Sequence, residues 1–310
     1  MSLLQVNNLH TYFDTRRGTV KAVNGVTFSL EEGKTLGIVG ESGSGKSQTA
    51  MSILQLFQKN QRIADGNIFF DGDEISSFSK KEMLKIRGND ISMIFQEPMT
   101  SLNPVFTVKY QLSEALLLHQ NMDKAAAAKR SYELLEKVRI PNPDRVLKQY
   151  PHQLSGGMSQ RVMIAMALAC NPKLLIADEP TTALDVIIQA EILKIMNELK
   201  DEYNTSILFI THDLGVISQM ADDVIVMYGG KIVESAPIKE IFNNAKHPYT
   251  KRLIAAFLKT DIKKRNTNET LDFYSGENEQ FDFSNFKEHA DADPDWVKIS
   301  DNHYVAATLK

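Results

Sequence analysis

The stretch GESGSGKS, Gly40 to Ser47, constrains the fold of this chain more than any other feature of its sequence. It has the form G-x-x-x-x-G-K-[ST] and lies between a short apolar stretch, TLGIVG, and the helical pattern QTAMSILQLFQ. A strand, a glycine-rich turn and a helix in this order form a concave backbone nest whose N–H groups bind phosphate. Lys46 then reaches the β- and γ-phosphates, and the Ser47 hydroxyl is suited to ligate Mg²⁺. The stretch therefore predicts an α/β protein that binds ATP or GTP.

The sequence around this loop alternates strand and helix patterns. β-type stretches with a tight turn at EEGK open the chain, and ISMIF, LLIAD and SILFIT are short apolar runs separated by helical stretches. This alternation favours a mostly parallel core sheet. A helix is expected from about 186 to 203, and a hairpin is expected around Gly229-Gly230.

The bulk composition excludes several classes of protein. With 310 residues, 43% of them hydrophobic and 24% charged, the chain is typical of a soluble globular protein. Its net charge of -4 gives it no overall positive potential of the kind that nucleic-acid-binding proteins usually have, so no nucleic-acid partner is expected. The single cysteine, Cys170, lies in an apolar run and is predicted to be a core residue. The N-terminus lacks a secretory signal, and no apolar stretch approaches the roughly 20 residues that span a bilayer. Any membrane role is therefore expected to come through a partner.

Four polar residues follow predicted strands. Asp178 and Glu179 end LLIADE, at the edge where an α/β sheet presents groups to a ligand. Asp178 is a candidate for the Mg²⁺ shell, and Glu179 is a candidate to polarise water. Gln96 after ISMIF and His212 after SILFIT are ambiguous alone, because a surface glutamine and a structural histidine are the commoner alternatives.

Taken in chain order, the motifs resemble those of the ATP-binding cassette ATPases. They are GESGSGKS, the Gln96 of IFQEP, LSGGMSQR, LLIADEP, the TALD that ends at Asp185, and the His212 of ITHD. The resemblance covers roughly residues 1 to 260, and its motifs are very specific.

This resemblance implies a P-loop NTPase fold with a mostly parallel core sheet and an N-terminal antiparallel β subdomain. The cassette is expected over residues 1–245, with a helical signature subdomain at about 97–165. Residues 246–310 are expected to form a C-terminal extension.

The second glycine-bearing turn, LSGGMSQR, is explained by pairing. In the cassette family two subunits associate head to tail, and each ATP lies between the phosphate loop of one and the LSGG turn of the other. The resemblance therefore implies that Ser155, Gly156, Gly157 and Gln160 contact the partner's nucleotide and that Asp185 lies at the dimer seam. A serine hydroxyl and two glycine N–H groups at a helix start are suited to a γ-phosphate.

The same resemblance assigns the nucleotide site. The implied catalytic residues are Glu179, His212 and Lys46, and the implied Mg²⁺ ligands are Ser47, Gln96 and Asp178. The implied nucleotide contacts are Tyr12, Gly40, Ser42, Gly43, Gly45, Lys46, Ser47, Gln48, Gln96 and Asp178. Tyr12 is expected to stack on adenine, with Phe13 as the alternative. Met158 replaces the glutamine that is commonest at its place, which is similar to the peptide-importer branch.

Two further stretches, QEPMTSLNPVFTV and AKHPYTKRLIAA, resemble the ATPases of oligopeptide, dipeptide and nickel importers. The first is expected to meet a permease, and the second is expected to begin the C-terminal extension. The branch implies an ATPase at the cytoplasmic face of the membrane, with transmembrane permease subunits, a second identical or homologous ATPase and an extracytoplasmic substrate-binding protein. No iron–sulfur cluster is expected, because such clusters need about four thiolates and no cysteine follows Cys170.

Several alternatives stay open from the sequence. The cargo could be short peptides, nickel or another small solute, because other proteins select it. A soluble cassette that acts on ribosomes or DNA is disfavoured by the single phosphate loop and by the absence of sustained heptads. Whether two identical or two different cassettes pair is not decided.

Overall fold

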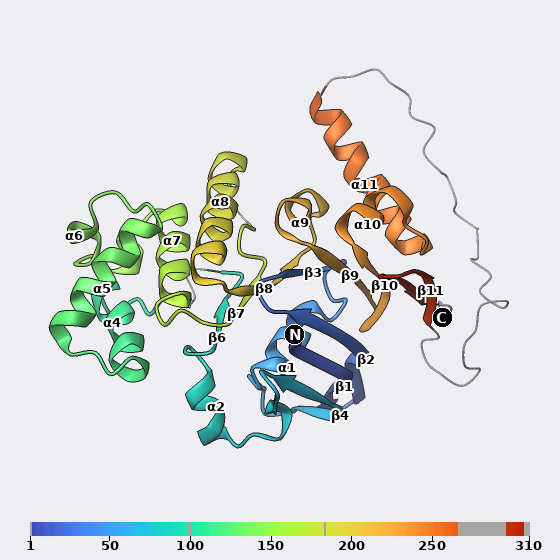
Figure 1. The fold of residues 1–310 in the computed structure, drawn as a ribbon, viewed down its shortest axis with the longest axis horizontal. Helices are drawn as coiled ribbons and strands as arrows, with labels where there is room; N and C mark the ends of the chain where they lie inside the picture. The colour runs from blue at the N-terminus through green and yellow to red at the C-terminus, as the bar shows by residue number, and fades with distance from the viewer. Residues whose placement is uncertain (1, 98–100, 183, 266–295, 307–310) are drawn as a thin grey trace. The chain divides into compact units, whose positions relative to one another are not determined.

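The computed structural model describes residues 2–97, 101–182, 184–265 and 296–306, and these pack as two compact units (Figure 1). The first unit comprises residues 31–34 and 77–210. The second comprises residues 2–30, 35–76 and the described residues from 211 onward. LSGGMSQR and LLIADEP thus belong to the first unit, and the phosphate loop belongs to the second.

The sheet of the first unit consists of parallel strands. β6 (Ile91–Ile94) pairs with β7 (Leu174–Asp178), and β7 pairs with β8 (Ser206–Thr211). Every residue of β7 and β8 is buried. Strands that are covered on both faces need continuous apolar side chains, which is why LLIAD and SILFIT do not alternate with polar residues. The predicted parallel arrangement of these strands is confirmed.

Most helices of the first unit begin at a side-chain cap. They are α2 (Lys80–Ile86), α4 (Val108–His119), α5 (Lys124–Lys137), α6 (Pro143–Val146), α7 (Gly156–Ala167) and α8 (Val186–Tyr203), with a 3₁₀ turn at Pro151–Gln153. The side chains of Thr107, Asp123, Ser155 and Asp185 each accept a backbone N–H of the turn that follows. Such a cap is worth about 1 kcal/mol. α6 is the exception among the described residues, since no side chain caps it. Along the described chain, no helix combines the length and the apolar character needed to cross a bilayer.

One sheet of the second unit is antiparallel and lies near the N-terminus (Figure 1). Its strand order is β2-β1-β4-β5, where β1 is Ser2–Thr15, β2 is Gly18–Glu31, β4 is Gln61–Phe70 and β5 is Asp73–Glu74. β4 runs antiparallel to both β1 and β5. A short 3₁₀ helix, Ile75–Ser77, follows β5. The expected N-terminal antiparallel sheet is thus present.

The other strands of the second unit carry the phosphate loop. β3 (Thr35–Val39) pairs in parallel with β9 (Asp223–Tyr228), and β9 forms the predicted hairpin with β10 (Lys231–Pro237). The helices are α1 (Lys46–Ile53), α9 (Leu214–Met220), α10 (Ile238–Asn244) and α11 (Pro248–Arg265). α1 ends earlier than its apolar pattern suggested, because Gln55 adopts φ +49°.

A C-terminal hairpin continues this sheet beyond β10. β12 (His303–Ala306) pairs with β10, and β11 (Trp296–Ser300) pairs with β12. The fully buried Glu234 carboxylate accepts hydrogen bonds from His303 Nε2 at 2.7 Å, from Lys246 N at 2.7 Å and from His247 N at 3.1 Å. Three donors compensate for the burial of this carboxylate, so the hairpin is joined to the turn before α11.

The burial of His247 predicts a pH dependence of stability. Burial, aided by the charge of Arg252, lowers the pKa of His247 from 6.5 to about 4. Between these values the unfolded chain binds a proton that the folded chain does not, so stability is lost as the pH falls, by up to about 3 kcal/mol.

We expect His247→Gln, which is neutral at every pH, to reduce this acid loss. The measurement is the free energy of urea unfolding of both proteins at about pH 7 and about pH 4.5. An equal loss in both proteins would contradict the assignment of this pH dependence to His247.

Candidate active site

The phosphate loop of the second unit connects β3 to α1. Lys46 is only 5% exposed, and its Nζ donates to the carbonyl oxygens of Gly40 at 2.8 Å and Glu41 at 2.9 Å. Gly45 has φ +103°, and a Cβ there would lie 2.5 Å from Ala22 O, so only glycine fits. α1 begins directly after Gly45, and its first N–H groups therefore belong to the same turn. The loop has the residues and the backbone that phosphate binding requires.

The remaining predicted loop residues lie in the same turn. Ser42 and Gly43 are exposed, while Ser47 and Gln48 are half-buried. The buried Ser44 Oγ has no hydrogen-bond partner among the described residues. An unpartnered buried hydroxyl in the same turn as a buried lysine is consistent with a polar ligand at this loop.

Tyr12 and His212 belong to the same unit but lie on other elements. Tyr12 is half-buried on β1, where its hydroxyl lies 3.1 Å from Asn24 Oδ1 and Lys21 Nζ lies 5.6 Å from its ring centroid. Phe13, the alternative adenine partner, is also half-buried. His212 is exposed in the turn between β8 and α9. Their roles toward a nucleotide stay predictions.

The first unit brings together two predicted residues that are 83 positions apart. Gln96 Nε2 donates to Glu179 Oε2 at 3.2 Å, and Thr182 Oγ1 donates to the same oxygen at 2.9 Å. Glu179 adopts φ +48°, an uncommon backbone conformation outside glycine, and its N–H donates to Ile210 O at 2.9 Å. Asp178 precedes it and is buried at the end of β7. The Glu179 carboxylate is therefore presented at a strand end and oriented by two neutral donors.

The LSGG turn lies at the start of α7. Ser155 and Gly156 are exposed and Gly157 is half-buried, and Ser155 Oγ accepts from Met158 N at 3.3 Å. Gln160 differs, because its side chain is 1% exposed and its Nε2 has no partner among the described residues. Of the four predicted partner-site residues, the three at the helix start are exposed or half-buried, whereas Gln160 is buried.

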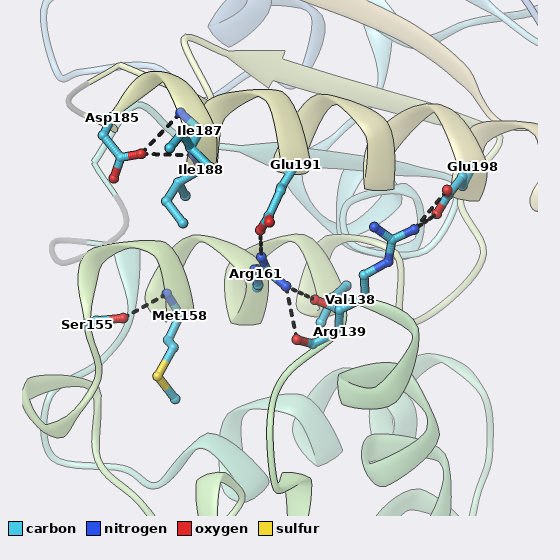
Figure 2. A network of polar contacts seen from close by, with 10 residues as sticks. All are labelled: Val138, Arg139, Ser155, Met158, Arg161, Asp185, Ile187, Ile188, Glu191 and Glu198. Atoms are coloured by element: carbon cyan, nitrogen blue, oxygen red, sulfur yellow. Dashed lines mark hydrogen bonds and ion pairs between the residues drawn. The ribbon is translucent and has the colours of Figure 1, made fainter.

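α7 and α8 run side by side, and Ser155 and Asp185 lie at the same end of the pair (Figure 2). Asp185 Oδ1 caps α8 by accepting from Ile187 N at 3.1 Å and Ile188 N at 2.9 Å. A Cβ at Gly157 would lie 3.1 Å from Ile188 Cγ2, so the two helix starts are in contact. The turn predicted to bind the partner's nucleotide and the residue predicted at the dimer seam are therefore neighbours. Ala183 of the TALD stretch lies outside the described residues.

Arg161 holds the two helices together, a role that the motif alone did not reveal. Its guanidinium donates to Arg139 O at 2.9 Å, to Val138 O at 3.3 Å and to the Glu191 carboxylate (Figure 2). The Arg161 side chain is 13% exposed, and the Glu191 side chain is 47% exposed. The only available signal was a charged residue within the apolar helical stretch that follows LSGG.

A groove of about 700 Å³ lies on the helical part of the first unit. It is lined by Thr107, Lys109, Tyr110, Ser113, Glu114, Leu117, Leu118 and Lys124. Leu118 is 70% exposed and Tyr110 is 50% exposed. The groove begins at the end of QEPMTSLNPVFTV, of which residues 98–100 lie outside the described residues.

Comparison with known proteins agrees with these features. Residues 23–182 match the family model described as ABC transporter, and residues 233–279 match the oligopeptide/dipeptide transporter, C-terminal region. The chain is 54% identical over 256 residues to the oligopeptide transport ATP-binding protein AppD of Bacillus subtilis, covering 82% of this chain and 78% of that one. It is 46% identical over 324 residues to OppD of the same organism, covering 99% and 88%. A solved dimeric cassette, MJ0796 bound to ADP and Pi, matches with a TM-score of 0.69 at 28% identity, covering 76% of this chain and 98% of that chain.

The Arg161 contacts predict a loss of stability when they are removed. We expect Arg161→Met to lower the free energy of unfolding by about 1–3 kcal/mol, because the Val138 and Arg139 carbonyls lose their donor. The measurement is urea unfolding of the full chain.

Arg139→Met is the matched control, because it removes an exposed pair with Glu198 and should cost only about 0–1 kcal/mol. Equal losses in the two variants would contradict the role given to Arg161.

Proposed function

The chain belongs to the ABC transporter family, and from that premise we propose that it is the ATP-hydrolysing motor subunit of a membrane importer for oligopeptides or dipeptides. Family membership confirms the resemblance drawn from the motifs, and the solved cassette confirms the expected α/β fold. The proposal of a peptide cargo rests on the match of residues 233–279 to the C-terminal region of oligopeptide/dipeptide transporters.

The chain's two glycine-bearing turns support a head-to-tail pair. The phosphate loop holds ATP, and the LSGG turn of a second cassette closes over its γ-phosphate. Ser155 Oγ accepts from Met158 N, which leaves its own O–H proton available for donation. The N–H groups of Gly156 and Gly157 open α7 and favour an anion. ATP thus joins two cassettes, and hydrolysis releases them.

Glu179 is the group that activates water in this proposal. Its carboxylate accepts a proton from the attacking water, while Lys46 offsets the negative charge of the phosphates. Gln96 donates a hydrogen bond to the Glu179 carboxylate. A change at the γ-phosphate that moves Gln96 would therefore also change the surroundings of this proposed base. His212 is proposed to contact the γ-phosphate as well.

By residue type, three predicted ligands suit Mg²⁺. The Ser47 hydroxyl, the Gln96 amide and the Asp178 carboxylate each carry an oxygen donor of the kind that this ion prefers. A bound Mg²⁺ would orient the phosphates and offset their charge. These three residues are the proposed ligands.

Partners and location follow from the same proposal. The groove on α4, with exposed Leu118 and Tyr110, is the proposed contact with a transmembrane permease at the cytoplasmic face. An extracytoplasmic substrate-binding protein delivers the cargo, and a second cassette, identical or homologous, completes the motor. Nickel as cargo is the alternative that the same architecture allows.

Replacing the proposed base tests the hydrolysis assignment. We expect Glu179→Gln to lower ATP turnover by about 10² to 10⁴ while nucleotide affinity is kept, because the amide cannot accept the proton. Phosphate release and nucleotide titration measure the two properties.

Glu198→Gln on the exposed side of α8 is the matched control and should turn over normally. Turnover near the unmodified rate in Glu179→Gln would overturn the general-base role.

Uptake by cells that lack this gene tests the cargo. Labelled dipeptides, tripeptides, longer peptides and nickel are offered in parallel. We expect loss of peptide uptake that the intact gene restores and Lys46→Ala does not. Loss of nickel uptake alone would establish the alternative cargo, and normal uptake of all of them would reject the importer proposal for these solutes.

A further inference from the structure

The C-terminal segment contacts the phosphate loop directly. The N–H of Glu41, the second residue of the loop, donates to the Tyr249 hydroxyl at 2.9 Å across 208 positions of sequence. Tyr249 is the second residue of α11, and it is 3% exposed. A residue of the HPYT stretch is therefore a hydrogen-bond partner of the loop.

This hydrogen bond acts on one particular peptide plane, the one between Gly40 and Glu41. Its N–H donates to Tyr249, and its carbonyl oxygen, Gly40 O, accepts from Lys46 Nζ at 2.8 Å. In this motif the lysine ammonium reaches the phosphates, so a bound nucleotide competes with Gly40 O for it. The Tyr249 bond then helps to keep this plane from turning its carbonyl dipole toward the phosphates, where it would repel them.

The position of the Tyr249 hydroxyl is itself fixed. Its ring centroid lies 4.6 Å from that of Tyr228. Its N–H donates to His247 Nδ1 at 3.2 Å, and His247 N donates to Glu234, the carboxylate that also holds His303. Burial raises the pKa of Tyr249, so the hydroxyl stays neutral at physiological pH. The hairpin, the turn before α11 and the loop are therefore linked by successive hydrogen bonds.

We infer that Tyr249 is a positioning residue for nucleotide binding, whose hydroxyl holds the Gly40–Glu41 peptide in the orientation that accepts phosphate. The inference rests on the proposed ATPase function. It assigns to the C-terminal segment a role in nucleotide affinity within the same subunit. The effect acts on binding of ATP and ADP alike, because both place phosphates in the loop.

The test compares Tyr249→Phe with Tyr228→Phe in the full chain. Both changes remove one hydroxyl from the same pair of rings, but only the first removes the acceptor of the Glu41 N–H. We expect Tyr249→Phe to raise the Kd for ADP with Mg²⁺ and the KM for ATP about three- to tenfold, the range of one lost hydrogen bond. Because ground state and transition state lose the same contact, kcat should stay unchanged. Tyr228→Phe should leave all three values unchanged.

Amide hydrogen exchange at residues 40–47 without nucleotide provides a second readout. We expect faster exchange in this loop in Tyr249→Phe and unchanged exchange in Tyr228→Phe. Unchanged nucleotide affinity and unchanged loop exchange in Tyr249→Phe would overturn the inference, as would equal effects in the two variants. If the unmodified chain failed to bind ATP or ADP, the proposed function would fail, and exchange at the loop would still decide whether Tyr249 positions it.

Discussion

The close backbone approach beneath the phosphate loop is the constraint on which the nucleotide site depends. A Cβ at Gly45 would lie 2.5 Å from Ala22 O, and Gly230 N donates to Ser44 O at 3.0 Å. The loop is thus seated on β2 and on the β9–β10 turn, and backbone hydrogen bonds fix its curvature before any ligand arrives. Preorganisation of this kind spares the nucleotide the cost of ordering the loop.

The acidic end of β7 is organised by a different constraint. Glu179 keeps a left-handed backbone, a conformation that costs about 1–3 kcal/mol outside glycine, and its N–H is satisfied by Ile210 O. This geometry turns the carboxylate toward the donors from Gln96 and Thr182. A strand that continued would place the side chain on a sheet face, so the left-handed backbone directs the carboxylate of the proposed base.

Sequence patterns predicted the elements best where the chemistry is local. The loop from Gly40 to Ser47, the helix at 186–203 and the hairpin at Gly229-Gly230 each follow from nearby residues, and the structure has all three. The burial of Gln160 could not be predicted from its motif, and its predicted contact with a partner's nucleotide stays a prediction. The bond between Tyr249 and Glu41 joins residues 208 positions apart, and no periodicity or propensity encodes such a pair.

The buried carboxylate of Glu234 explains why the C-terminal hairpin and α11 act together. Its three donors come from His303 on β12 and from the backbone at Lys246 and His247. Removing one donor leaves the fully buried carboxylate with fewer hydrogen bonds to offset its loss of hydration. A change in the hairpin therefore also affects the turn that precedes Tyr249. The extension therefore reaches the phosphate loop through polar contacts whose removal has a defined cost.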